Sequence, residues 1–219
     1  MKLVIGNKNY SSWSMRPWVA LRQAAIPFEE VLLEFGDDGK PRGVERYSPA
    51  RKVPALILDD GEVIWDSLAI CETAAELHPE KALWPAAPAA RRAARAVCAE
   101  MHSGFQALRD HLVMNIRSSH PGKGINPQSQ KDIDRVVEIW RSCRARFGSA
   151  GGLLFGSFSI ADAFYAPVVT RFDTYAVPLP KEAREYCEAV HRLSAVREWI
   201  EAARRETGFV AADEPYASR

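Results

Sequence analysis

The chain has 219 residues, of which 47% are hydrophobic and 26% are charged, and both values are ordinary for a soluble globular protein. Lys and Arg number 29 against 28 Asp and Glu, so the net charge is +1 and no overall field favours nucleic acid or a membrane surface. We find neither a secretory signal pattern nor a run of about 18 apolar residues. We therefore expect a cytoplasmic protein that binds neither nucleic acid nor a membrane.

Four cysteines are spread along the chain, and each falls within a helical pattern. They are Cys71, Cys98, Cys143 and Cys187. None forms a C-x-x-C pair, which is the spacing that redox and metal sites favour. We expect reduced, buried thiols, as in proteins of the cytosol.

The first 77 residues alternate between strand and helix patterns. Leu3 to Ile5 predicts a short strand, and a helix with apolar residues from Val19 to Ala25 follows it and ends before Pro27. The run 28–33 predicts a second strand. The polar stretch after it contains several glycines, and we expect a loop with a short irregular helix over 44–47.

A β-hairpin is predicted next, because an Asp-Gly turn at Asp60-Gly61 separates two β-prone runs, 55–58 and 62–65. A helix from Ser67 to about Leu77 follows. The resulting order is β-α-β-α-β-β-α, with the first two strands parallel and the hairpin adding antiparallel strands to the same mixed four-stranded sheet.

The composition changes at a proline-containing segment over 79–88, which reads as a linker. The sequence after it predicts only helices, over 89–116, 133–147, 163–172, 181–190 and 195–206. The segment Ser159-Ile160-Ala161-Asp162 has the pattern of a capping box that opens the third of these helices. This second part is therefore expected to be an all-helical bundle.

Three serines occupy the polar turn between the first strand and the first helix, namely Ser11, Ser12 and Ser14. A helix N-terminus offers unpaired backbone N–H groups and a positive dipole end, which stabilise an anion such as a phosphate, a carboxylate or a thiolate. The simpler interpretation is that one serine caps the helix and the others are loop residues. The turn alone does not decide between these interpretations.

The joint order of these motifs, with Val53-Pro54 before the hairpin and Asp66-Ser67 after it, resembles the cytosolic glutathione transferases over the whole chain. The resemblance implies a thioredoxin-like domain over 1–78, a linker over 79–88, and an all-helical domain over 89–219 that lines the site for an electrophile. Members of this family are usually dimers, so we expect a homodimer.

The opening turn is most similar to that of the zeta class, whose members include maleylacetoacetate isomerases and whose turn reads Ser-Ser-Cys-x-x-Arg. Here the turn reads Ser11-Ser12-Trp13-Ser14-Met15-Arg16, so Trp13 stands where the class has its cysteine. This departure excludes thiol exchange through a cysteine at that position. It also weakens the assignment to the isomerases.

The resemblance also implies which residues form the site. Ser11 is the first candidate for the hydroxyl that stabilises the glutathione thiolate, Ser12 is the second, and Tyr10 is a weaker competitor; Ser14 is expected to cap the helix, with Pro17 in its first turn. The residues expected to bind glutathione are Ser11, Trp13, Lys52, Val53, Pro54, Asp66, Ser67 and Gln106. Those expected to line the electrophile site are Met101, Phe105, Arg109 and Met114, and the Val53-Pro54 bond is expected to be cis.

The leading interpretation is an enzyme that conjugates glutathione, its co-substrate, to a small electrophile. One alternative is a glutathione-dependent cis-trans isomerase of the maleylacetoacetate isomerase kind. Another is a glutathione-binding interaction module with little catalysis, because a fold does not by itself establish a function. No histidine pair has the spacing of metal ligands, so we predict no metal.

Overall fold

The computed structural model describes residues 1–148 and 151–217. The strands are β1 (Lys2–Gly6), β2 (Glu29–Leu33), β3 (Ala55–Ile57) and β4 (Val63–Ile64). The α-helices are α1 (Ser12–Gln23), α2 (Ser67–Leu77), α3 (Pro88–Ser103), α4 (Gln106–His111), α5 (Pro127–Phe147), α6 (Ile160–Thr174), α7 (Lys181–His191) and α8 (Ser194–Arg205). Short 3-10 helices cover Val44–Arg46, Pro79–Lys81 and Ala211–Asp213.

The four strands form one mixed sheet in the order β2-β1-β3-β4. Strand β1 pairs in parallel with β2, with Val4 opposite Val31, and antiparallel with β3, with Leu3 opposite Leu56. Strands β3 and β4 form the predicted hairpin. The expected order of elements is confirmed, and the helix expected between the second and third strands is the single turn Val44–Arg46.

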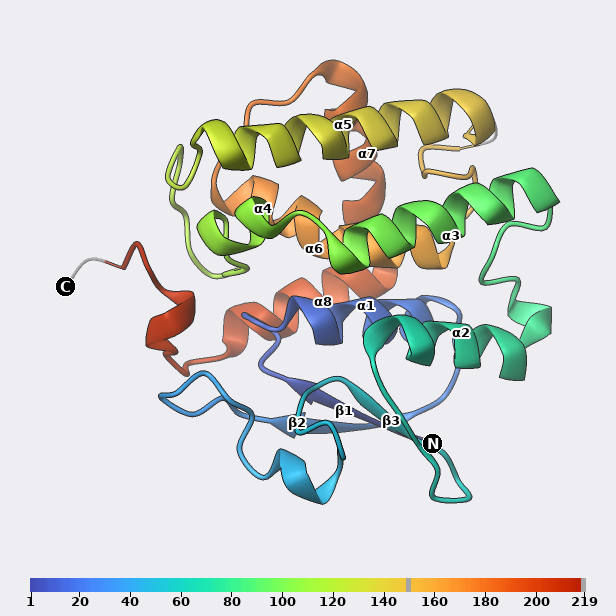
Figure 1. Cartoon of the computed structure of the whole chain (residues 1–219), viewed down its shortest axis with the longest axis vertical. Coiled ribbons are helices and arrows are strands. Elements are labelled where there is room, and N and C mark those ends of the chain that lie inside the picture. Colours follow the sequence, from blue (N-terminus) through green and yellow to red (C-terminus); the bar gives the residue numbers. More distant parts are fainter. Residues whose placement is uncertain (149–150, 218–219) are drawn as a thin grey trace.

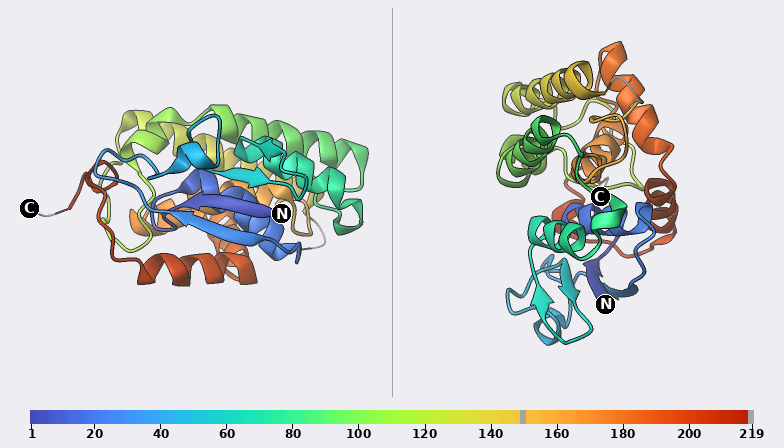
Figure 2. Two further views of the ribbon diagram at one scale, coloured as in Figure 1. Left: turned by 90° about the horizontal axis from the view of Figure 1, so that it is seen from below. Right: turned by 90° about the vertical axis from the view of Figure 1, so that its right-hand side faces the viewer.

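Helices α1 and α2 lie beside the sheet, and helices α3 to α7 are stacked beyond them (Figure 1). Helix α6 is the centre of the helical part, because nearly every one of its residues is buried and it packs against α1, α3 and α7. Helix α8 returns to pack against α1. The right-hand view of Figure 2 shows the sheet at one end of the molecule and the α5 and α7 layer at the other.

One continuous apolar core joins the two parts of the chain. Trp18 of α1 packs edge-on against Trp199 of α8, with ring centroids 5.3 Å apart. In the helical part, Trp140 lies 4.6 Å from the ring of Tyr186 and 6.0 Å from that of Tyr165. Side chains of this size each remove a large apolar area from water, and they fix how α1 sits on the helices.

The prediction of one long helix over 89–116 is wrong, because the helix is interrupted between α3, which ends at Ser103, and α4, which begins at Gln106. Phe105 adopts a left-handed backbone conformation with φ 62°, which a bulky residue rarely takes. The backbone carbonyls of Met101 and Gly104, at the end of α3, accept hydrogen bonds from the side chain of Arg109 on α4. The break turns α4 and the irregular segment after it towards the N-terminal part of the chain, and they form one wall of the site described below.

Helix α5 starts six residues before its predicted start at Ile133. Asn126 caps it by accepting hydrogen bonds from the backbone N–H groups of Gln128 and Ser129, and Pro127 occupies the first helical position. Proline is well suited to that position because its missing N–H would have no partner there.

The four cysteines are buried and free, as expected. Within residues 1–148 and 151–217, no helix is long and apolar enough to cross a membrane. The same residues hold no group of three or more His, Cys, Asp or Glu side chains arranged as metal ligands.

Candidate active site

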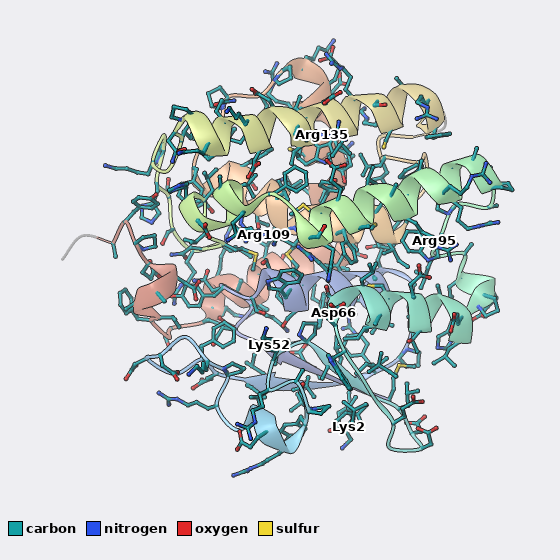
Figure 3. The ribbon with its side chains drawn as sticks, viewed as in Figure 1. Lys2, Lys52, Asp66, Arg95, Arg109 and Arg135 are labelled. Carbon is teal, nitrogen blue, oxygen red and sulfur yellow. The ribbon has the colours of Figure 1, made fainter. Side chains whose placement is uncertain are left out.

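A cleft of about 560 Å³ lies between the N-terminal α/β part and the helices. Its floor comes from the serine turn, the start of β3 and the start of α2, and its opposite wall comes from α3, α4 and the segment after α4. In Figure 3, Lys52 and Asp66 lie on the side of the sheet and Arg109 lies on α4 opposite them. Groups from both parts of the chain therefore face the same space.

The serine turn is capped by Ser11, which corrects the expectation that Ser14 is the cap. The Ser11 hydroxyl accepts from the backbone N–H of Ser14 at 3.4 Å and donates to the Ser14 hydroxyl at 2.7 Å. Ser14 in turn accepts the N–H of Gly6 at 3.1 Å. Pro17 is the sixth residue of α1 and so lies beyond its first turn.

Ser12, the first residue of α1, lines the cleft and is almost fully buried. Its hydroxyl accepts a hydrogen bond of 3.2 Å from Nη2 of Arg171, which belongs to α6. A hydroxyl also has one proton to donate. Its hydrogen bond from Arg171 leaves that proton for an acceptor in the cleft.

The Val53-Pro54 bond is cis, as expected, and both residues line the cleft with Lys52. Asp66 caps α2 by accepting the N–H of Leu68 at 2.9 Å.

The other oxygen of the Asp66 carboxylate lies 3.0 Å from Nε2 of His102, which links α2 to α3 across the cleft. The Ser67 hydroxyl is buried, lines the cleft and has no hydrogen-bond partner among residues 1–148 and 151–217. A buried unpaired hydroxyl costs about 1–3 kcal/mol, so it favours a ligand that binds it.

The predicted electrophile residues divide into two pairs. Arg109 and Met114 line the cleft. Met101 and Phe105 are core residues, 0% and 7% exposed, and are not among those that line it. Gln106 is exposed on α4, bonds to Asp110 and also lies outside the lining.

Arg171 and Asp213 line the cleft and were not expected from the sequence. Arg171 is the one basic residue of α6, whose acidic residues are Asp162 and Asp173, and a basic residue in this mostly apolar helix is the signal that could have identified it. Asp213 belongs to the C-terminal segment, which folds back over the site and is held by contacts such as that between Tyr10 and Glu214. Nothing in the local sequence around Asp213 indicates this position.

The cleft is electropositive on its helical side. Burial, followed by the charge of Arg109, lowers the pKa of Arg171 to about 9, and burial also lowers the pKa of Arg109. Burial raises the pKa of Asp213 to about 6, although the nearby charge of Arg171 opposes this shift. Nη1 of Arg109 is buried without a partner among residues 1–148 and 151–217. An anion placed here would meet two arginines.

Trp13 lies on the cleft surface within a cluster of cations. The guanidinium carbons of Arg16 and Arg109 lie 4.2 and 4.8 Å from its ring centroid. Its ring also packs edge-on against His102 at 5.2 Å. Trp13 therefore helps to hold Arg109 at the cleft, since cation–π contacts stabilise a guanidinium over an indole ring.

The two parts of the chain match two domain families, one each. Residues 10–77 match the family described as Glutathione S-transferase, N-terminal domain, and residues 123–202 match Glutathione S-transferase, C-terminal domain. The maleylacetoacetate isomerase of Rattus norvegicus is 30% identical over 177 residues, which are 77% of this chain and 77% of the rat protein. The chain therefore belongs to the glutathione S-transferase family.

Other relatives are also named as maleylacetoacetate isomerases. A probable maleylacetoacetate isomerase of Caenorhabditis elegans is 35% identical over 105 residues, 48% of each chain, and that of Dictyostelium discoideum is 33% identical over 115 residues. The chain thus spans about half the length of these two relatives, 48% and 52%.

Two solved structures have the same fold. A maleyl pyruvate isomerase of the zeta class has a TM-score of 0.72 at 23% identity, with 95% of this chain and 100% of that chain covered. A glutathione transferase homologue from Burkholderia, crystallised with glutathione, has a TM-score of 0.71 at 22% identity, covering 94% and 98% of the two chains. At these identities the likeness shows the fold.

Proposed function

We propose that the protein binds glutathione in this cleft and uses its thiolate to attack a small electrophile that carries a carboxylate. The observation that carries the proposal is the position of the Ser12 hydroxyl, which lies at a helix N-terminus and faces a cleft lined by two arginines. A thiolate and a carboxylate are both anions, and both are stabilised by such a site.

The floor of the cleft offers the groups that a γ-glutamyl tripeptide needs. The free N–H groups at the start of α2 and the unpaired Ser67 hydroxyl suit the γ-glutamyl carboxylate, and the Asp66 carboxylate suits its ammonium group. The backbone of Val53 suits strand-like pairing with the cysteinyl unit. Lys52, at the rim, suits the glycyl carboxylate.

Ser12 is favoured over Ser11 as the donor to the thiolate. The Ser11 hydroxyl already serves the helix cap and donates to Ser14, whereas the proton of the Ser12 hydroxyl is free for a ligand. Arg171 polarises the Ser12 hydroxyl by donating to its oxygen, which strengthens the bond that the hydroxyl gives in turn. Tyr10 is engaged with Glu214, so it is a weaker candidate than either serine.

The energy required is modest. A free thiol has an ordinary pKa near 8.5. To lower that pKa by about two units, the site must stabilise the thiolate over the thiol by about 2.7 kcal/mol. One hydroxyl hydrogen bond to a charged acceptor contributes about 1.5–3 kcal/mol, and the helix N-terminus adds about 0.3–1 kcal/mol. A separate general base is therefore unnecessary.

Conjugation and isomerisation use the same thiolate. In conjugation the thioether product leaves; in isomerisation the thiolate adds to a cis double bond, the resulting single bond rotates, and elimination releases the trans isomer and returns the thiolate. Isomerisation is the alternative reaction that the structure supports. The relatives named above are maleylacetoacetate isomerases, and a maleyl group carries a carboxylate next to its double bond. Arg109 and Arg171 in the cleft suit such a carboxylate.

The first experiment is retention on immobilised glutathione with elution by free glutathione, followed by assay of conjugation and isomerisation on a panel of electrophiles. The panel pairs each carboxylate-bearing compound with its neutral methyl ester, and it includes a cis-enoic keto acid such as maleylacetoacetate. We expect retention and a preference for the free acid over its ester. Failure to bind glutathione would contradict the proposal, and a preference for the esters would contradict the anionic substrate class.

A further inference from the structure

Arg16 is the most unusual charged residue of the molecule. It is 0% exposed, in the second turn of α1, one helical turn after Ser12. Its Nε, Nη1 and Nη2 atoms have no hydrogen-bond partner among residues 1–148 and 151–217. A buried charge in proteins is normally paired or hydrogen-bonded, so this arrangement calls for a reason.

The groups packed around Arg16 do not neutralise it. Its guanidinium carbon lies 4.2 Å from the ring centroid of Trp13 and 4.9 Å from that of Phe164, so aromatic faces take the place of hydrogen-bond acceptors. The thiols of Cys71 on α2 and Cys98 on α3 lie nearby, but burial raises the pKa of both and they stay protonated.

The remaining charged neighbours of Arg16 have its own sign. They are Arg109 on α4 and Arg171 on α6, and after burial these two charges are the main influences that lower the pKa of Arg16. No carboxylate among residues 1–148 and 151–217 forms an ion pair with Arg16. Among residues 1–148 and 151–217, the charge of Arg16 therefore has neither a hydrogen-bond acceptor nor an ion-pair partner.

We propose that the uncompensated charge of Arg16 stabilises the thiolate of glutathione across one turn of α1, without touching the sulfur. The inference rests on the proposed function, since it concerns the same thiolate. Residues i and i+4 of a helix lie on one face, which places the guanidinium beneath Ser12 and against Trp13 at the cleft surface. The bound anion supplies the compensation that the protein itself lacks.

The size of the effect follows from Coulomb's law. Two unit charges about 8–10 Å apart, one helical turn and part of a side chain, shift an ionisation by about one pKa unit at an effective dielectric constant near 20. The same charge destabilises the empty fold, because removing an unpaired buried charge is favourable. Arg16 should thus lower stability and raise activity, a trade-off common at functional sites.

The test compares Arg16→Met and Arg16→Gln with the wild type and with Arg22→Met. Arg22 lies on the same helix, but it is exposed and paired with Glu198, so this variant controls for substitution of an arginine on α1. The readouts are thermal unfolding without ligand, the pKa of bound glutathione from its thiolate absorption in the ultraviolet, and the pH profile of kcat/KM with an uncharged electrophile.

We expect both Arg16 variants to unfold at a higher temperature than the wild type and to raise the thiol pKa by about one unit, with a matching shift of the pH profile. Arg22→Met should leave the thiol pKa unchanged. Arg16 variants that fold less stably, fail to fold, or keep the wild-type thiol pKa would overturn the inference alone. A wild-type protein that does not lower the thiol pKa would overturn the proposed function and this inference with it.

Discussion

Nη2 of Arg171 donates a hydrogen bond of 3.2 Å to the hydroxyl of Ser12, which joins the central helix of the bundle to the first residue of α1. The arginine is itself fixed, because its Nε donates to the carbonyl of Leu112 at 2.7 Å. The serine hydroxyl is therefore oriented by a residue 159 positions away in sequence. The N-terminal turn and the helical bundle build the candidate site together.

Replacing Arg171 with Met should weaken binding of carboxylate-bearing electrophiles. Loss of a charge-assisted hydrogen bond of about 1.5–3 kcal/mol predicts a KM about 10- to 100-fold higher. The neutral methyl ester of the same electrophile serves as the internal control, and its KM should change much less. Equal increases in KM for acid and ester would show that Arg171 acts through the fold or through Ser12 and not by binding the carboxylate of the substrate.

Glu206 should be important for holding the serine turn. Its carboxylate accepts the backbone N–H groups of Lys8 at 2.6 Å and Asn9 at 3.1 Å, just before the serines. Glu206→Ala leaves both N–H groups without this partner, so we expect a loss of about 2–3 kcal/mol in the free energy of unfolding, measured with urea. Glu206→Gln, which keeps one acceptor oxygen, should lose less, and the exposed Glu201→Ala should lose little.

Asp213 should make binding of an anionic electrophile depend on pH. Its raised pKa of about 6 means that the side chain is neutral below that pH and negative above it, where it opposes an incoming carboxylate beside Arg171. We expect KM for the acid to rise by about 3- to 10-fold as pH increases through this range. Asp213→Asn should abolish the rise, and an unchanged pH profile in that variant would contradict the assignment.

The same group affects stability in a direction that can be worked out. A carboxyl whose pKa is higher in the folded than in the unfolded state contributes stability below its ordinary pKa near 4. That contribution is lost as pH rises through about 6. The stability of Asp213→Asn relative to the wild type should therefore increase over the same range, as measured by chemical unfolding at each pH.

Asp162 should matter for stability and not for glutathione. Its fully buried carboxylate accepts the N–H groups of Ser159 at 3.0 Å and Leu154 at 3.1 Å, as well as the Tyr186 hydroxyl. Asp162→Ala leaves these donors unpaired, which predicts a loss of about 2–4 kcal/mol. Folded variant protein should retain its glutathione affinity by titration, and a selective loss of catalysis would refute a structural role.

Local signals were sufficient for much of the fold. Helix α2 runs from Ser67 to Leu77 as predicted, because Asp66 is a strong N-cap and an apolar stripe follows it. The hairpin follows from Asp60-Gly61, and α6 from its capping box at Ser159. Each of these signals lies within a few residues of the element that it predicts.

The errors in the fold arose where distant contacts decide. The break at Phe105 depends on Arg109 reaching back to the end of α3, and propensity favours one long helix there. The cap of α1 went to Ser11 and not to Ser14, because Ser14 is taken by the N–H of Gly6 in β1. Neither contact, that of Arg109 with the end of α3 or that of Gly6 with Ser14, can be identified from the local sequence.

The candidate site was predictable in part. Resemblance pointed to the floor residues Val53, Pro54, Asp66 and Ser67, which the structure brings together at the cleft. On the opposite wall, Arg109 and Met114 were also expected. Arg171 and Asp213 were not, because packing alone brings them to the cleft. The charge of the site, and with it the proposed substrate class, therefore required the structure.

The central claim is tested most directly by the thiol pKa of bound glutathione. This pKa is measured in the Ser12→Ala variant and compared with that in the wild type and in Ser11→Ala. It is read from the pH dependence of the thiolate absorption in the ultraviolet. We predict a thiol pKa well below its ordinary value of about 8.5 in the wild type, a rise of about one to two units in Ser12→Ala, and a smaller rise in Ser11→Ala. A lowered pKa that survives in Ser12→Ala and is lost in Ser11→Ala would contradict the assignment of the thiolate to Ser12.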